Sequence, residues 1–333
     1  MTKILAIESS CDETSASVII DGQVKSNLIA TQAIHRAYGG VVPELASRAH
    51  QQNIVPVVME ALKEAQITTK ELNAIAFTRG PGLLGALIVG TAFAKSLALS
   101  LEIPLIEVNH MQAHVLAHFI DEPKPKFPFL CLTVSGGHTQ IVLVKDYLEM
   151  EVIGTTQDDA VGEAFDKTAK MLSLPYPGGV EIDKLAQKGT VKDYGLPKVD
   201  LPNLDFSFSG LKTAILYFIK KQEQKNPNFI KENITDICAT IQHTLIETLL
   251  RKIIQAAEQQ NINQIAIAGG VSANSELRKR MTELGQEKNW DIFIPKMEYC
   301  TDNAAMIAMA AHYKFLKKDF SSQTVAPLSR MSF

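Results

Sequence analysis

The sequence predicts an α/β protein that is built from two similar halves. Its 333 residues exceed what one hydrophobic core usually supports. The same order of strand and helix patterns also occurs twice along the chain. A content of 46% hydrophobic and 21% charged residues is typical of a soluble globular chain. We therefore expect two domains, at residues 1–121 and 122–333.

The first half begins with three short strand patterns and then alternates helices with strands. Short apolar runs predict the strands, and Asp21-Gly22 predicts a tight turn between the second and the third. Apolar residues that recur at helical spacing predict the helices. The expected strands are 3–8, 16–20, 24–30, 74–78 and 105–108, and the expected helices begin at 43, span 83–101 and contain His110.

The second half repeats this order after a Pro- and Lys-rich stretch, 122–126. A mostly helical insertion, at about 174–261, separates its third strand from its fourth. Three antiparallel strands followed by alternating helices and parallel strands form the ribonuclease-H-like half. The actin, Hsp70 and sugar-kinase superfamily contains this half twice, with a nucleotide cleft between the two. The expected strands are 129–134, 140–144, 149–153, 264–268 and 291–294, and the expected helices begin at 160 and 274 and span about 302–315.

Charge, cysteine usage and hydropathy argue against several classes of protein. A net charge of −3 is unlike a protein that coats nucleic acid by electrostatics alone, so a nucleic acid would be a substrate held by one patch or by a partner. The four cysteines are scattered without a Cys-x-x-Cys, which argues against a thiolate zinc site or a disulfide framework. Segment 83–101 contains Lys95 and suits a buried helix better than a membrane span. The N-terminus resembles no signal peptide, so we expect a cytoplasmic protein that is not associated with a membrane.

The stretch 110–114, His-Met-Gln-Ala-His, is the clearest candidate for a metal site. Two histidines four residues apart on a helix project from one face and can bind one ion. A zinc protease with such a pair carries a glutamate beside the first histidine as general base, and this chain does not. His118 continues the same stripe, so packing histidines are the alternative. Asp302 would complete a set that suits iron or zinc with open positions, although Asp302 or Thr301 would equally cap the last helix.

Three glycine turns at strand ends predict a phosphate-binding surface. Glycine lets backbone N–H groups approach a phosphate closely, and open α/β sheets bind ligands at the carboxyl ends of their strands. The turns are Ser-Gly-Gly at 135–137, Gly-Gly at 269–270 and Gly-Pro-Gly at 80–82. One glycine pair commonly marks an ordinary turn, but three at strand ends favour nucleotide binding.

Polar residues near these turns have a structural and a functional interpretation. Segment 9–14, Ser-Ser-Cys-Asp-Glu-Thr, joins the first two strands, where the superfamily contacts phosphates or a metal, and it also suits turn chemistry. Asp159 suits the start of a helix, where negative charge is favourable. Asp166 lies too far into that helix to cap it. Asn274 is an N-cap or a nucleotide contact.

Eight motifs together resemble the tRNA N6-adenosine threonylcarbamoyltransferase (TsaD) family over nearly the whole chain. Its Ser-Cys-Asp-Glu-Thr start resembles the bacterial branch. Met-Gln-Ala stands between the histidines where many bacterial members have Met-Glu-Gly; these are not ligands in the family, so metal binding is still expected. The motifs are IESSCDET at 7–14, HMQAH at 110–114, VSGGHTQ at 134–140, DDAVGEAFDK at 158–167, YPGG at 176–179, FSFSGLKT at 206–213, GGVSAN at 269–274 and CTDN at 300–303.

The resemblance implies an enzyme that transfers a threonylcarbamoyl group from threonylcarbamoyl-AMP to N6 of adenosine 37. Its substrates would be tRNAs that read codons beginning with A, and its product t6A. The resemblance implies one divalent metal per subunit, iron(II) ahead of zinc, held by His110, His114 and Asp302. Bacterial relatives work with an inactive paralogous subunit and a small ATPase subunit, so both are expected partners. It implies that the adenylate, or ATP, contacts Thr133, Val134, Ser135, Gly136, Gly137, Asp166, Gly179, Asp183 and Asn274.

The transfer needs a proton acceptor for the exocyclic amine, and the sequence does not identify one. Asp12 and Glu13 are our candidates from their position in the fold. Two other functions are alternatives. A metalloprotease is disfavoured by the missing glutamate and by the phosphate turns. An ATP-binding chaperone-like or regulatory module of the same fold would need no metal.

Overall fold

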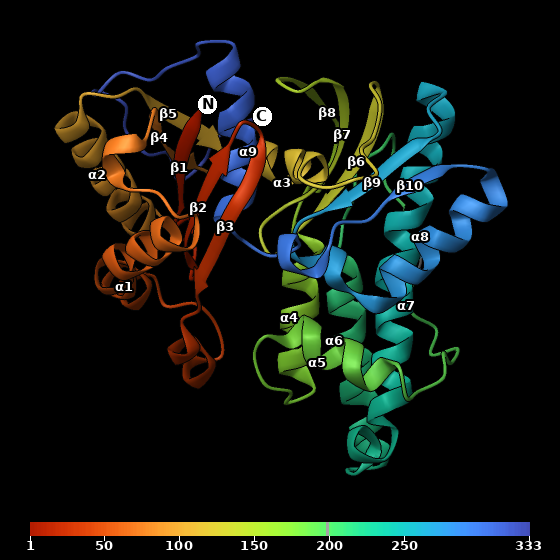
Figure 1. The fold of residues 1–333 in the computed structure, drawn as a ribbon. Helices are drawn as coiled ribbons and strands as arrows, with labels where there is room; N and C mark the ends of the chain where they lie inside the picture. Colours follow the sequence, from red (N-terminus) through yellow and green to blue (C-terminus); the bar gives the residue numbers. More distant parts are fainter. Residues whose placement is uncertain (198–199) are drawn as a thin grey trace. The chain divides into compact units, whose positions relative to one another are not determined.

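A computed structural model describes residues 1–197 and 200–333, apart from the side chains at 36 and 37. The chain forms two compact units, each with a five-stranded sheet (Figure 1). We call them unit 1 and unit 2. Unit 1 comprises Met1–Lys124, Lys145–Met150 and Pro295–Phe333, and unit 2 comprises Pro125–Val144 and Glu151–Ile294.

The sheet of unit 1 has the strand order β3-β2-β1-β4-β5. Strand β2 pairs antiparallel with β1 and β3, whereas β4 pairs parallel with β1 and β5. The strands are β1 (Lys3–Glu8), β2 (Thr14–Ile20), β3 (Gln23–Ala30), β4 (Ala74–Gly80) and β5 (Leu105–Asn109). The helices of this unit are α1 (Pro43–Glu64), α2 (Leu84–Leu101), α3 (His110–Leu116) and α9 (Ala304–Leu316), with 3-10 helices at Ala33–Tyr38, Thr69–Glu71, Ala117–Phe119 and Met297–Tyr299.

The sheet of unit 2 has the same design. Read from β8, its order is β8-β7-β6-β9-β10, and β6 is antiparallel to β7 and parallel to β9, as β1 is to β2 and β4. This repeat confirms the predicted α/β fold of two ribonuclease-H-like halves. The strands are β6 (Phe129–Val134), β7 (Thr139–Asp146), β8 (Glu149–Thr155), β9 (Gln264–Ala268) and β10 (Asp291–Phe293).

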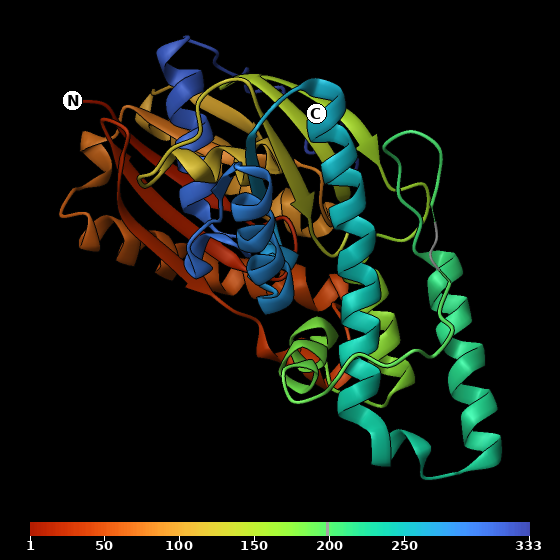
Figure 2. The same cartoon turned by 90° about the vertical axis from the view of Figure 1, so that its right-hand side faces the viewer.

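Most helices of unit 2 lie between β8 and β9 in the sequence, where a helical insertion is expected. The 32-residue helix α7 packs beside α6 (Figure 2). The buried faces of α4 and α7 cover Leu130, Leu132 and Ile265 in one hydrophobic core. The helices are α4 (Val161–Met171), α5 (Gly178–Ala186), α6 (Ser209–Lys225), α7 (Phe229–Gln260) and α8 (Ser275–Lys288), with a 3-10 helix at Gly270–Ala273.

Helix α2 belongs to the core of unit 1. It has the length and composition of a membrane span, and 33% of its apolar window is buried. Its inward side chains, which include Ala86, Leu87 and Ala94, are buried, and the helix packs against β4 and α1. The helix expected at 83–101 is therefore present as a partly buried core helix, with its other side exposed.

The last segment of the chain returns to unit 1. Helix α9 packs against β1, β2 and β3. The backbone N–H of Ala304 donates to Ser15 Oγ at 2.8 Å, and that of Ala305 donates to Asn27 Oδ1 at 3.1 Å. Because of this return, the compact units do not follow the expected domains, 1–121 and 122–333, in chain order.

The turn after β9 provides a test of the packing in unit 2. Gly269 has φ +87°, and a Cβ there would lie 2.5 Å from the carbonyl oxygen of Val134. We expect Gly269→Ala to lower the free energy of unfolding by about 2 kcal/mol or more, because it adds backbone strain and a backbone clash. The control is Gly270→Ala, since no heavy atom lies within 4 Å of a Cβ at Gly270. Urea unfolding of both variants measures the effect, and equal losses would contradict this account.

Candidate metal centre and nucleotide-binding residues

The histidine pair lies on α3 because a capping residue starts the helix directly after β5. The side chain of Asn109 accepts hydrogen bonds from the N–H groups of Met111 at 2.9 Å and Gln112 at 3.2 Å. His110 is therefore the first helical residue, and His114 follows one turn later on the same face. The sequence analysis missed Asn109, although an asparagine before a helical pattern is a known N-cap signal.

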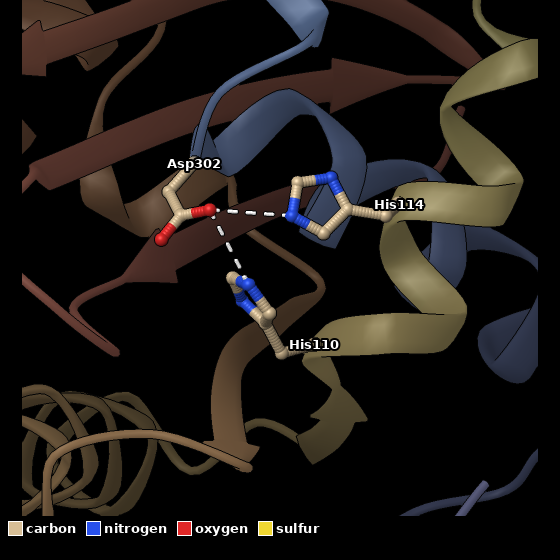
Figure 3. A group of neighbouring side chains, drawn as sticks. All are labelled: His110, His114 and Asp302. Atoms are coloured by element: carbon tan, nitrogen blue, oxygen red, sulfur yellow. Dashed lines mark hydrogen bonds and ion pairs between the residues drawn. The ribbon is translucent and has the colours of Figure 1, made fainter. Parts of the chain in front are cut away.

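The three predicted metal ligands converge within unit 1. The Nε2 atoms of His110 and His114 lie 3.3 Å and 3.2 Å from the same Oδ1 atom of Asp302 (Figure 3). One ligand atom from each residue lies within 4.8 Å of the other two. The two histidines are buried and Asp302 is partly exposed. Two imidazole nitrogens and one carboxylate oxygen are a donor set that suits iron(II) or zinc.

The cap of helix α9 differs from the prediction. Asn303, rather than Thr301 or Asp302, is the N-cap, and its side chain accepts from the N–H of Met306 at 3.1 Å. The carboxylate of Asp302 contacts both histidines instead. A cap one residue later therefore leaves Asp302 available as a metal ligand.

Negative side chains dominate the surroundings of the histidines. Burial raises the pKa of Asp302, but His110 and His114 outweigh it and hold this pKa well below its usual range. Burial lowers the pKa of His110, but Asp302 and Glu8 outweigh burial and raise it. Burial, with Asp302 and Asp12 nearby, raises the pKa of Glu13 to about 9. The carboxylates around the two histidines thus favour a bound cation.

The loop with the two candidate proton acceptors is anchored to helix α1. His50 Nδ1 and Thr14 Oγ1 are hydrogen-bonded at 2.8 Å, and His50 Nε2 lies 3.0 Å from the carbonyl oxygen of Cys11. Asp12 and Glu13 lie between these two anchored residues, and Glu13 is close enough to Asp302 for its pKa to respond. The loop therefore belongs to the surroundings of the metal ligands.

The predicted phosphate turn of unit 2 is open. Thr133 and Val134 end β6, and the N–H of Ser135 donates to the carbonyl oxygen of His138 at 2.8 Å to close the turn. No heavy atom lies within 4 Å of a Cβ placed at Gly136 or Gly137. Such an open turn leaves room for a ligand beside its backbone.

Three further predicted residues, Asp166, Gly179 and Asp183, take part in contacts between neighbouring helices of unit 2. Asp166 Oδ1 accepts from the N–H groups of Gly178 at 2.8 Å and Gly179 at 3.2 Å. Asp183 accepts from the N–H of Ser275 at 3.1 Å and from its hydroxyl at 2.6 Å. These bonds join α4 to α5 and α5 to α8.

Asn274 has the predicted structural role. Its Oδ1 accepts from the N–H of Leu277 at 3.0 Å and caps α8, and its Nδ2 donates to Gln242 at 2.7 Å. Asp159, expected at the start of a helix, precedes α4 and instead pairs with Lys167 at 3.1 Å and Lys212 at 2.6 Å. Contacts of Asn274 with a nucleotide stay a prediction.

The glycine turn at 80–82 is not an open phosphate turn. A Cβ at Gly80 would lie 2.0 Å from the carbonyl oxygen of Leu328. The N–H of Gly82 donates to the carbonyl oxygen of Ser329 at 3.2 Å. The expectation for this turn is wrong because its glycines accommodate the C-terminal segment, which passes close to the backbone.

We expect loss of either histidine ligand to weaken metal binding by about 100-fold or more, because even residues behind the ligands contribute 10- to 100-fold. The variants are His110→Gln and His114→Gln, tested by titration of the metal-free protein with Co(II) and visible absorption. His118→Gln is the control, because His118 is buried on the same stripe but lies outside the ligand group found among the described residues. An equal loss of metal affinity in His118→Gln would contradict the assignment of His110 and His114 as the histidine ligands.

Comparisons with known proteins identify the family of this chain. The model of the TsaD family, tRNA N6-adenosine threonylcarbamoyltransferase, matches residues 23–309. The tRNA N6-adenosine threonylcarbamoyltransferase of Cytophaga hutchinsonii is 58% identical over 328 residues, which cover 98% of this chain and 96% of that protein. The protein of the same name from Christiangramia forsetii is 60% identical over 333 residues, with 99% and 98% covered.

Solved structures with lower identity share the fold. Full-length HypF, in a form described as phosphate- and nucleotide-bound, has a TM-score of 0.63 at 13% identity and covers 95% of this chain and 46% of its own. The activator of the 2-hydroxyisocaproyl-CoA dehydratase from Clostridium difficile, with bound ADPNP, has a TM-score of 0.52 at 12% identity and covers 96% and 99%. The sequence matches go further than the fold: the chain belongs to the TsaD family of tRNA N6-adenosine threonylcarbamoyltransferases.

Proposed function

We propose that this chain forms t6A at a divalent metal held by His110, His114 and Asp302, with iron(II) favoured over zinc. The transferase activity follows from membership of the family. The proposed metal rests on one observation: two imidazole nitrogens and one carboxylate oxygen lie within 4.8 Å of one another. Three protein ligands leave coordination positions open for a substrate, as in catalytic metal sites.

The chemistry requires a polarised acyl carbonyl, a held phosphate and a positioned amine. A bound metal supplies Lewis acidity for the carbonyl. Asp12 and Glu13 are the proposed candidates for the proton acceptor. Burial and nearby carboxylates raise the pKa of Glu13 to about 9.

The donor adenylate is proposed to bind unit 2. Gly136 and Gly137 would offer backbone N–H groups to its phosphate, and the space beside both glycines supports this role. The other proposed contacts are Thr133, Val134, Ser135, Asp166, Gly179, Asp183 and Asn274. The nucleotide-bound forms of HypF and of the dehydratase activator, which share the fold, support a nucleotide ligand.

An inactive paralogous subunit and a small ATPase are the proposed partners. Large apolar side chains are exposed along neighbouring helices of unit 1: Val55 and Met59 on α1, and Leu84, Ile88 and Leu99 on α2. We call these five residues the α1–α2 face. We propose that the paralogous subunit contacts this face, because exposed apolar side chains that gather on a surface commonly mark a protein interface.

The cytoplasm is the proposed location. The tRNA substrate is made and used there. The cysteines that the structure describes, Cys11, Cys131, Cys238 and Cys300, form no disulfide with one another, which suits a reducing compartment.

Nucleoside analysis tests the transferase directly. Unmodified tRNA is incubated with threonine, bicarbonate, ATP, the enzyme that makes the adenylate, the partner subunits and this chain. We expect t6A with the wild type and with His118→Gln, and at least about 100-fold less with Asp302→Asn, because the carboxylate ligand is lost. The absence of t6A above a control without this chain would falsify the function. Peptide cleavage that disappears in Asp302→Asn would favour the metalloprotease.

If the paralogous subunit binds the α1–α2 face, a charge introduced into this face should weaken the complex. We expect Met59→Glu to reduce co-purification with the paralogous subunit at least about tenfold, because a charge buried in an apolar contact is costly. The control is Met297→Glu, since Met297 is 60% exposed and Met59 is 59% exposed. If both variants bind the subunit as the wild type does, the contact lies elsewhere.

A further inference from the structure

We propose that Glu8 is a positioning residue that holds His110 with its Nε2 atom toward the metal. The inference rests on the proposed metal site and names a residue behind its ligands. Glu8 is the last residue of β1, and its side chain is completely buried, with 0% exposure. Burial of a carboxylate is costly unless it is well hydrogen-bonded, so its contacts identify its role.

The carboxylate of Glu8 is fixed by three neighbours. Its Oε1 atom accepts from the N–H of Ser10, and its Oε2 atom accepts from the hydroxyl of Thr78. The same Oε2 atom lies 3.1 Å from His110 Nδ1. The hydroxyl of Ser10 lies 3.2 Å from Nδ1 as well. The polar neighbours of Nδ1 thus come from the end of β1 and the residues just after it.

The ring of His110 therefore connects two carboxylates. Nδ1 faces Glu8, and Nε2 lies 3.3 Å from Asp302 Oδ1. A neutral imidazole has one N–H and one lone pair. If the Nδ1 proton is donated to Glu8, the lone pair lies on Nε2 and points at the ligand group. Histidine ligands commonly donate their other N–H to a carboxylate, which fixes the ring and raises its basicity.

The second histidine has no comparable support. His114 Nδ1 is buried and has no hydrogen-bond partner among the described residues. Its ring is held by packing and by its Nε2 contact with Asp302 at 3.2 Å. The orientation of the pair thus depends on the Glu8 contact more than the equal spacing of the histidines suggests.

The test compares two isosteric substitutions that each remove one negative charge. Glu8→Gln removes the carboxylate behind His110. Glu107→Gln is the matched control, because Glu107 lies in β5 three residues before His110 and pairs with Arg79 at 2.8 Å. Zn(II) affinity is measured on metal-free protein by competition with a chelating dye, and urea unfolding checks the fold of each variant. We expect a 10- to 100-fold loss of affinity in Glu8→Gln and a loss below about threefold in Glu107→Gln.

Each outcome bears on a separate claim. A Zn(II) affinity of folded Glu8→Gln within about threefold of the control would overturn the role of Glu8 and leave the metal site intact. If the wild type itself binds no Zn(II), the proposed metal site fails and the inference fails with it. If Glu8→Gln does not fold, NMR of the zinc-loaded wild type with 15N-labelled histidine decides. A proton on His110 Nδ1 with Nε2 bound to zinc supports the inference, and the opposite arrangement overturns it.

Discussion

The return of helix α9 to the sheet of unit 1 is the constraint on which the candidate metal site depends. Ser15 and Asn27, on β2 and β3, accept hydrogen bonds from the first two residues of α9 and fix its start. Asp302 lies just before that start, and α9 also packs against α3. The carboxylate thereby meets two histidines that lie nearly two hundred residues earlier. Neither segment forms a metal site without the other.

The sequence predicted features that depend on neighbouring residues, but it did not predict contacts between residues far apart in the chain. The shared face of the two histidines follows from their spacing along one helix. The capping role of Asn274 follows from an asparagine at the start of another helix. Both features could therefore be predicted from the sequence. The contact between Glu8 and His110 joins residues 102 positions apart and depends on the parallel pairing of β1, β4 and β5. A repeating pattern of apolar residues does not predict a contact between residues so far apart in the chain. The cap at Asn303 was missed for the opposite reason, because Thr301, Asp302 and Asn303 are all acceptable caps and only packing selects one.

The glycine turns show why a motif alone does not identify a ligand site. Gly80 and Gly269 are each required by a nearby carbonyl oxygen of the chain itself, whereas Gly136 and Gly137 have open space beside them. In sequence the four residues look alike, since each lies at or just after a strand end. The absence of a side chain allows the close approach of any backbone or ligand. What approaches is decided by tertiary structure, and at Gly80 it is the C-terminal segment.

Several carboxylates surround the candidate metal ligands, so the proposed transfer between anionic molecules would need a bound cation. Glu8, Glu13 and Asp302 lie close enough to influence one another, and the pKa of Glu13 reaches about 9 partly because of its negative neighbours. The negative side chains would repel a phosphate that came close to these ligands. A divalent ion held by His110, His114 and Asp302 would offset this charge and supply a Lewis acid. Met111 stands where a zinc protease with such a histidine pair carries its glutamate, so this stretch lacks the protease motif.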